Sequence, residues 1–407
     1  MREARPDALL GVRGYLARDP HLLVGLMTGT SADAVDAALV RFEGLGLESR
    51  HQLLAYRETT LEPALRREVL EVAGAASLPP ERLMRLDAAL GECYAAAVFE
   101  LLAAADVAPA RIDAVGSHGQ TVRHLPRARE GGQALTLQIG SAAILAERTG
   151  LTVVSDFRSR DTAAGGEGAP LVPLADWWLF RSPEESRALL NLGGMANVTH
   201  LPRGAGLDRV LAFDTGPGNA VIDALAALAS GGAERRDPGG ARAARGRAHE
   251  ALLAELLADP FFAQPPPRST GRERFGDGYA ERLQELGEGL GLSLEDTLAT
   301  AVELTAASIE QAIREHLEPR GKVDAVYASG GGVRNVSLML ALRRRLDGIR
   351  LERLDELGVS AGIKEALAFA VLAHLTLCGE AGNVPGATGA RRPVVLGSIT
   401  PGGAAGG

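Results

Sequence analysis

Residues 22–40 read LLVGLMTGTSADAVDAALV and decide the fold. The apolar run 22–27 predicts a buried strand, and the apolar run 35–40 predicts its neighbour. Between them, residues 28–31 form a Thr-Gly-Thr-Ser turn. Backbone N–H groups freed by the glycine, together with three hydroxyls, can point at one anion. The pattern therefore predicts either a phosphate-binding turn or an ordinary hairpin turn.

Two carboxylates follow this turn. Asp33 and Asp36 lie two and five residues past Ser31. Carboxylate oxygens are hard ligands, so one of them could hold a metal ion against phosphate oxygens. The sequence has no Walker A motif, no protein-kinase motif set and no Cys/His array with zinc spacing. Any metal is therefore expected to be a hard ion that arrives with phosphate.

Length and composition limit the class of protein. The chain has 407 residues, 46% of them hydrophobic and 23% charged, which is typical of about two to three globular domains. A net charge of −8 argues against nucleic-acid or anionic-membrane partners. Cys93 and Cys378 lie in apolar helical patterns and are interpreted as buried thiols in a reducing, cytoplasmic compartment. No signal peptide or membrane span is predicted.

Strand and helix patterns alternate along the chain, which predicts an α/β fold. The run 188–192 ends in Gly193 and Gly194 and resumes at 196–201, repeating the plan of the first hairpin. This repetition suggests two related lobes, each with a phosphate turn. A third glycine turn, Gly330 to Gly332, follows the apolar run 323–328. Helices are expected at 81–104, 141–148, 298–317, 336–346 and 363–377.

Three polar clusters follow predicted strands, where α/β folds place ligands. In DFRSRD, residues 156–161, the two arginines suit an anionic group, or they form an internal Asp–Arg salt-bridge cluster. Asp214 is either a helix cap, which the local pattern favours, or a general base. His118 is either catalytic or a hydrogen-bonded structural imidazole.

Together these clusters resemble the anhydro-N-acetylmuramic acid kinases, a family in the hexokinase, Hsp70 and actin superfamily. The matching motifs occur in order over nearly the whole chain after residue 21. They are GLMTGTSADAVD (25–36), SHGQTVRH (117–124), LQIG (137–140), TVVSDFRSRDTAAGGEGAPLVP (152–173), LNLGGMANVT (190–199), FDTGPGNAVIDA (213–224), RSTGRERF (268–275), ASGGGVRN (328–335), KEALAFAVLA (364–373) and GNVPGATGA (382–390).

The resemblance implies a two-lobed, actin-like (ribonuclease H-like) α/β fold with a cleft between the lobes. Residues 1–20 are expected to be an N-terminal extension and 401–407 a loose tail. The first lobe is expected to span 21–156, with 380–400 returning to it, and the second lobe 157–379. A homodimer is also expected from the resemblance.

The resemblance also implies an activity. Members of this family use ATP and water to open 1,6-anhydro-N-acetylmuramic acid and phosphorylate O6, which gives N-acetylmuramic acid 6-phosphate in cell-wall recycling. Asp214 matches the base that activates water, which raises that reading above capping. Arg160 and Glu365 match positions at the sugar and attacking water, with Ser117 and His118 bordering the pocket.

The residues expected at ATP are those of the three glycine turns. Gly29, Thr30 and Ser31 would cradle the β- and γ-phosphates, and Asp33 would help to hold Mg²⁺ through water. The full ATP-binding set is Gly29, Thr30, Ser31, Ala32, Asp33, Ala34, Val35, Asp36, Gly193, Gly194, Gly330, Gly331, Gly332 and Asn335.

Some positions depart from the family pattern. Ala34 replaces a glycine of the phosphate turn, so we expect an ordinary backbone there or a slightly shifted turn. Ser159 replaces an arginine that would bear on the sugar's carboxylate, and Ser141 replaces an Asp or Asn. Two alternatives therefore remain: an N-acetylhexosamine kinase without ring hydrolysis, and a non-catalytic nucleotide-binding regulator of the same fold.

Overall fold

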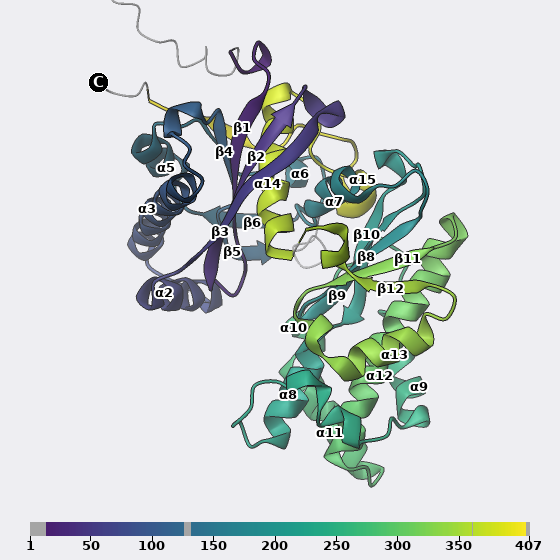
Figure 1. The fold of residues 1–407 in the computed structure, drawn as a ribbon. Coiled ribbons are helices and arrows are strands. Elements are labelled where there is room, and N and C mark those ends of the chain that lie inside the picture. Colours follow the sequence, from purple (N-terminus) through teal and green to yellow (C-terminus); the bar gives the residue numbers. More distant parts are fainter. Residues whose placement is uncertain (1–13, 126–131, 360, 404–407) are drawn as a thin grey trace, which may run out of the picture. The chain divides into compact units, whose positions relative to one another are not determined.

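The protein is divided into two compact units. A computed structural model describes residues 14–125, 132–359 and 361–403 (Figure 1). Unit 1 comprises residues 1–178 and 362–407, and unit 2 comprises residues 179–361. The first 13 residues of the expected extension and the last four of the expected tail lie outside the described residues.

Unit 1 is built on a six-stranded sheet of order β13-β7-β4-β1-β2-β3. Strands β1, β2 and β3 form an antiparallel meander, and β4 and β7 extend it in parallel from β1. Strands β5 and β6 pair separately. The bounds are β1 His21–Thr28, β2 Ala34–Glu43, β3 Arg50–Thr60, β4 Ala114–Ser117, β5 Gln120–Leu125, β6 Leu135–Ile139, β7 Val153–Ser155 and β13 Ser398–Thr400.

Helices cover both faces of this sheet (Figure 1). Val24 and Leu26 of β1 share a hydrophobic core with α3, and Gly25, which points to the opposite face, meets α14. Residues 366–377 of α14 are all buried, as in a helix that is surrounded by protein. The bounds are α2 Pro63–Gly74, α3 Pro80–Ala104, α5 Ala142–Thr149, α6 Ser159–Ala163, α7 Val172–Phe180, α14 Ala361–Cys378 and α15 Pro385–Thr388.

Two paired glycines let α14 approach the sheet closely. Gly25 of β1 and Gly116 of β4 are partners in the parallel ladder. A Cβ on Gly25 would lie 2.0 Å from the Ala366 carbonyl oxygen, and one on Gly116 would lie 2.2 Å from that of Phe369. Any larger residue would therefore push the helix away from the sheet.

Unit 2 is built on a five-stranded sheet of order β10-β9-β8-β11-β12. Its strands are β8 Arg187–Leu192, β9 Met195–Leu201, β10 Leu211–Pro217, β11 Ala325–Ser329 and β12 Arg350–Arg353. Its helices are α8 Ala220–Ala229, α9 Glu250–Leu257, α10 Arg272–Phe275, α11 Asp277–Gly289, α12 Leu294–Ala312 and α13 Val336–Arg345. The central helix α12 begins with a capping box formed by Ser293 and Asp296.

The two units share one topology. In each, three antiparallel strands are followed by two strands that add in parallel on the side of the first strand. This strand order is the ribonuclease H-like arrangement, and the predicted α/β fold is confirmed. The repeat of strand, glycine turn and strand reflects this shared topology.

The division between the units differs from the predicted boundaries at 157 and 379. Residues 157–178 pack within unit 1, because Asp161 accepts hydrogen bonds from Asn383 and Thr388 and Trp178 stacks on Phe42. Helix α14 also belongs to unit 1. Hydrophobic pattern alone identifies α14 but does not say which sheet this helix covers.

Candidate active site

The predicted phosphate turn connects β1 to β2. The strand β1 ends at Thr28, and the Ala32 N–H donates to the Gly29 carbonyl oxygen over 3.0 Å. Ala32 has a left-handed φ of 49°, whereas Ala34 begins β2 with an ordinary backbone. The ordinary backbone expected at Ala34 is confirmed, and the left-handed residue lies two positions earlier. Ala32 and Val35 are fully buried, so neither residue is open to a nucleotide in this structure.

The turn has the features of an anion cradle. A Cβ on Gly29 would meet nothing closer than the Ser31 hydroxyl, at 3.9 Å, so glycine leaves free room above the backbone. Within the described part of the chain, the N–H groups of Thr30 and Ser31 have no acceptor. Free N–H groups beside open space fit a bound phosphate.

Asp33 is the carboxylate nearest to this turn. It is exposed, and its Oδ1 pairs with Arg66 over 2.7 Å. No group of three or more His, Cys, Asp or Glu side chains that could hold a metal occurs among residues 14–125, 132–359 and 361–403. Asp33 is therefore an exposed carboxylate beside the turn that is already paired with Arg66.

Asp36 and Glu365 form an acidic pair in unit 1. Tyr56 donates a short hydrogen bond to Asp36, and burial raises the pKa of that carboxyl. Burial also raises the pKa of Glu365, with a smaller contribution from Asp36, while Lys364 and Arg158 oppose the increase. The Glu365 carboxylate is thus half-buried and lies near both acidic and basic side chains. This position is suited to hydrogen bonding with a sugar hydroxyl.

His118 is held by Arg158. The Arg158 Nε donates to His118 Nε2 over 3.1 Å, and the imidazole packs on Phe369 at 4.7 Å between ring centroids. Burial, and then Arg158, lower the pKa of His118 well below 6.5. His118 is therefore a neutral, hydrogen-bonded imidazole. It lines a hollow of about 290 Å³ with Ser117.

The two arginines of DFRSRD have different surroundings. Arg158 is bound to His118 and to the Gly168 carbonyl oxygen. Arg160 is exposed and lines another hollow, of about 150 Å³, with Arg391 and Arg392. Asp161 accepts hydrogen bonds from Asn383, Thr388 and the Gly168 N–H. The alternative of an internal Asp–Arg salt-bridge cluster is therefore wrong for Arg158 and Asp161.

Asp214 lies on β10 at a β-bulge, where the ladder shifts register between Asp214 and Gly216. It is thus a strand residue, and the capping alternative is wrong: the residue before α8 is Asn219. The Thr270 N–H donates to Asp214 Oδ2 over 2.8 Å. Burial raises the pKa of Asp214 to about 6, although Thr270 and Arg268 act to lower it.

A buried arginine shapes the loop around Asp214. The Arg268 Nε donates to the Asp214 carbonyl oxygen, and its Nη1 donates to the carbonyl oxygens of Phe262 and Gln264. In return the Asp214 N–H donates to the Arg268 carbonyl oxygen over 3.1 Å. These bonds fix Thr270 beside the carboxylate. The Thr270 hydroxyl is buried, and the described residues give it no partner, so it is available to a ligand or water.

Asn219 ties the glycine turns of unit 2 together. Its Nδ2 donates to the carbonyl oxygens of Leu192 and Gly193, and a Cβ on Gly332 would lie 3.1 Å from it. Gly194 has a different role, because a Cβ there would meet nothing closer than Arg272 at 3.8 Å. Like Gly29, it leaves room for a ligand beside the backbone.

A polar hollow of about 220 Å³ opens beside these turns. It is lined by Gly331, Asn219 and Asn335, whose Oδ1 also caps α13 through the Leu338 N–H. Asp223 lines it too, and burial raises the pKa of this carboxyl to about 6. The predicted residues of the second and third glycine turns are therefore brought together in unit 2.

Several residues of this region could not be found from the sequence motifs. Arg268 and Thr270 lie about 55 positions after Asp214, and Tyr56 lies on the strand next to Asp36. Lys364 forms a buried ion pair with Asp176 over 3.1 Å. RSTGRERF contains Arg268 and Thr270, and KEALAFAVLA contains Lys364, but neither motif says which residue these side chains contact. None of the motifs contains Tyr56.

The family model for anhydro-N-acetylmuramic acid kinase matches residues 21–402. The chain belongs to this family. The protein of that name from Caldanaerobacter subterraneus subsp. tengcongensis is 43% identical over 386 residues, 94% of this chain and 98% of the relative. The one from Salinibacter ruber is 45% identical over 397 residues, 97% of this chain and 99% of the relative.

Solved structures are more distant. Component A of the (R)-2-hydroxyglutaryl-CoA dehydratase from Acidaminococcus fermentans is 13% identical, with a TM-score of 0.39, and the match covers 87% of this chain and 99% of that one. This likeness carries no argument about function.

As a member of the anhydro-N-acetylmuramic acid kinase family, the chain is a kinase, and the predicted resemblance is confirmed. A kinase of this family uses ATP and a sugar. None of the described helices is both long and apolar enough to cross a membrane.

Proposed function

We propose that the chain uses ATP and water to convert 1,6-anhydro-N-acetylmuramic acid into N-acetylmuramic acid 6-phosphate, in the cytoplasm, during peptidoglycan recycling. Family membership supports the substrate class. The observation that carries the reaction is Asp214, a half-buried carboxylate whose pKa is raised to about 6. Such a carboxylate is ionised at neutral pH and still basic enough to accept a proton from water.

In the proposed step, Asp214 takes one proton from water while the water oxygen bonds to C1 of the sugar. The bond between C1 and O6 breaks, and its electron pair stays on O6. O6 then bonds to the γ-phosphorus of ATP, the bond to the β–γ bridging oxygen breaks, and ADP leaves. The Thr270 N–H holds the carboxylate in one orientation. The protein's contribution is alignment and proton acceptance.

The remaining residues are assigned to the phosphates, the nucleotide, the sugar and the metal ion. We propose that Gly29, Thr30 and Ser31 bind phosphate in unit 1, and that Gly193 and Gly194 bind phosphate in unit 2. Gly330 to Gly332 and Asn335 bind the nucleotide, and of these Gly331 and Asn335 line the hollow of about 220 Å³. Glu365, Ser117 and His118 contact the sugar, and Arg160 is proposed to do so from its exposed helix. Mg²⁺ supplies charge neutralisation on the phosphates, near Asp33.

Replacing the base tests the proposal. Asp214→Asn should lower sugar-dependent ADP release by about 10²–10⁴-fold, the usual contribution of a general base. The fold should be retained, because asparagine can still accept the Thr270 N–H and removes a buried charge. The matched control is Asp347→Asn, which neutralises an exposed aspartate of the same unit and should leave the rate unchanged. Unchanged turnover in Asp214→Asn would show that another group is the base.

The two alternatives are separated by labelled water. Incubation with ATP, H₂¹⁸O and the anhydro sugar should place one ¹⁸O on C1 of the phosphorylated product. Phosphorylation of N-acetylhexosamines without label at C1 would instead identify the kinase that does not hydrolyse a ring. Absence of any sugar-dependent ADP release would favour the non-catalytic regulator.

A further inference from the structure

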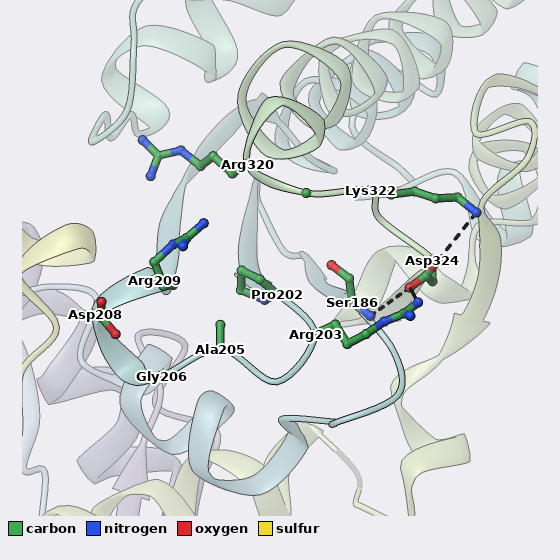
Figure 2. A pocket seen from close by; sticks show the side chains of 11 residues that line it. Ser186, Pro202, Arg203, Ala205, Gly206, Asp208, Arg209, Arg320, Lys322 and Asp324 are labelled. Carbon is green, nitrogen blue, oxygen red and sulfur yellow. Dashed lines mark hydrogen bonds and ion pairs between the residues drawn. The ribbon is translucent and has the colours of Figure 1, made fainter.

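A second hollow lies in unit 2 at the amino ends of the central strands, opposite to the ends that carry the glycine turns. Strands β8 and β11 are parallel, so Gly193 and Gly330 follow their carboxyl ends, whereas Ser186 and Asp324 precede their first residues. Ser186 and Asp324 line a hollow of about 680 Å³ (Figure 2). Because the glycine turns follow the carboxyl ends of these strands and the hollow lies at their amino ends, the hollow is separate from the glycine turns.

The hollow carries excess positive charge. Its cationic side chains are Arg203, Arg209, Arg320 and Lys322, and its acidic ones are Asp208 and Asp324. Four positive and two negative charges leave a formal excess of two. The whole chain has a net charge of −8, so this cluster opposes the average. Concentrated charge of one sign in a concave surface attracts counter-ions.

On one side of the hollow, the carboxylate of Asp324 balances the positive charge of its neighbours. Asp324 accepts the Ser186 N–H over 3.0 Å and pairs with Arg203 over 2.9 Å and with Lys322 over 3.6 Å. These hydrogen bonds and charges lower the pKa of Asp324, so its carboxylate stays ionised. Asp324 therefore balances the cations nearest to it and cannot serve the rest of the hollow.

The other side has two arginines, Arg209 and Arg320, and one carboxylate, Asp208 (Figure 2). Within the described chain, the guanidinium groups of Arg209 and Arg320 form no ion pair or hydrogen bond. Figure 2 shows both on the same side of the hollow, away from Asp324 and Lys322. Two unpaired guanidinium groups in one concave site form a receptor for an anion.

The buried neighbour His200 supports this placement. Its Nε2 contacts the Ser186 hydroxyl at 3.1 Å, and it is fully buried. Burial, followed by Arg320 and Arg209, lowers the pKa of His200 to about 4. Both arginines thus lie within electrostatic range of the same buried imidazole. His200 is neutral and supplies no compensating charge.

We propose that this hollow binds a small phosphate-bearing anion, gripped by Arg209 and Arg320. The planar guanidinium fork matches pairs of phosphate oxygens, and two such forks favour a multivalent anion. A volume of about 680 Å³ exceeds the need of one inorganic phosphate and is in the range of small-molecule sites. The ligand is therefore a phosphorylated metabolite, and the inference does not depend on the reaction proposed above.

Inorganic pyrophosphate is the probe for this site. Titration calorimetry on the full chain should show two classes of binding, one at the nucleotide turns and one in this hollow. Arg209→Gln/Arg320→Gln should weaken one class by at least about tenfold and leave the other unchanged. The affected class should also weaken as NaCl is raised, since exposed charges are screened.

The matched control is Arg343→Gln, which removes an exposed arginine of the same unit from α13, outside the hollow. It should retain both classes. Arg209 and Arg320 are exposed, so the double variant should unfold at the wild-type temperature. If it does not, Arg209→Lys/Arg320→Lys replaces it, and weaker binding is still expected because lysine lacks the fork. Identical isotherms for the wild type and the folded double variant would overturn the proposal.

Discussion

Asp214 is the residue whose chemistry depends most on its surroundings. Its carboxylate must be ionised to accept a proton, and burial raises its pKa to about 6. We therefore expect kcat/KM for the sugar, at saturating ATP, to fall as pH decreases through about 6 and to be constant above about 7. His118 should not contribute, because its pKa is well below 6.5.

Asp223 provides the control for this profile, because its pKa is also raised to about 6. Asp223→Asn should keep the same midpoint, whereas a midpoint that moves with this substitution would assign the titration to the nucleotide hollow.

Stability should change in the opposite direction. Asp214 has a higher pKa in the folded state, so its burial cost is absent at low pH and appears as pH rises through about 4 to 6. Loss of activity at pH 5.5 should thus occur without unfolding.

Two glycines of unit 2 should respond differently to alanine. A Cβ on Gly194 has no protein atom within 3.8 Å, so Gly194→Ala should fold normally and raise the KM for ATP by at least about tenfold. A Cβ on Gly218 would lie 2.4 Å from the Gly193 carbonyl oxygen, so Gly218→Ala should lose about 1–3 kcal/mol of stability. Urea unfolding and ATP-dependent rates measure both effects. An unchanged KM in Gly194→Ala would exclude close approach of phosphate to this turn.

At the scale of elements, the contact between α14 and the sheet is the tightest constraint. Gly25→Ala would place a Cβ 2.0 Å from the Ala366 carbonyl oxygen, so we expect a loss of about 3 kcal/mol or more. The control is Gly74→Ala at the end of α2, where a Cβ meets nothing within 4 Å. It should be neutral or stabilising by up to about 1 kcal/mol. Equal midpoints in urea would contradict the close approach.

The sequence predicts most elements because their patterns are local. The hairpin of β1 and β2, the strand β8 and the helix α3 lie within a few residues of the predicted ranges. The strand position of Asp214 was not predictable, because FDTGPGN contains the glycines of both a bulge and a helix entry. The left-handed residue of the first turn is Ala32, and no local rule singles out an alanine for that conformation.

Long-range partners are the part that the sequence leaves open. The contacts of Arg268 with Asp214, and of Arg158 with His118, join segments about 40 to 55 residues apart. A motif reports which side chains are present, but the topology of the sheet decides which of them meet. The same reason explains why Arg158 and Arg160, two positions apart, line different surroundings.

At the scale of the whole molecule, unit 2 is formed by one continuous segment of the chain, whereas unit 1 is formed by two separate segments. The large core cluster of unit 2 uses only residues between 188 and 351. We therefore expect residues 179–361 to fold when expressed alone, with helical circular dichroism and a cooperative urea transition. Residues 1–178 alone should not, because they lack α14 and expose the glycine-lined face of their sheet. A cooperative transition in the 1–178 fragment, or none in 179–361, would contradict this division.

The late position of α14 in the chain also sets an order of events during synthesis. A ribosome that adds about 5–20 residues per second completes every strand of unit 2 before it reaches α14. The first 178 residues therefore cannot complete their fold until residues 361–378 have left the exit tunnel. Until then, the sheet surface at Gly25 and Gly116 is not covered by α14. The second half of this polypeptide can mature first, and the nascent first half is the segment that most needs a chaperone.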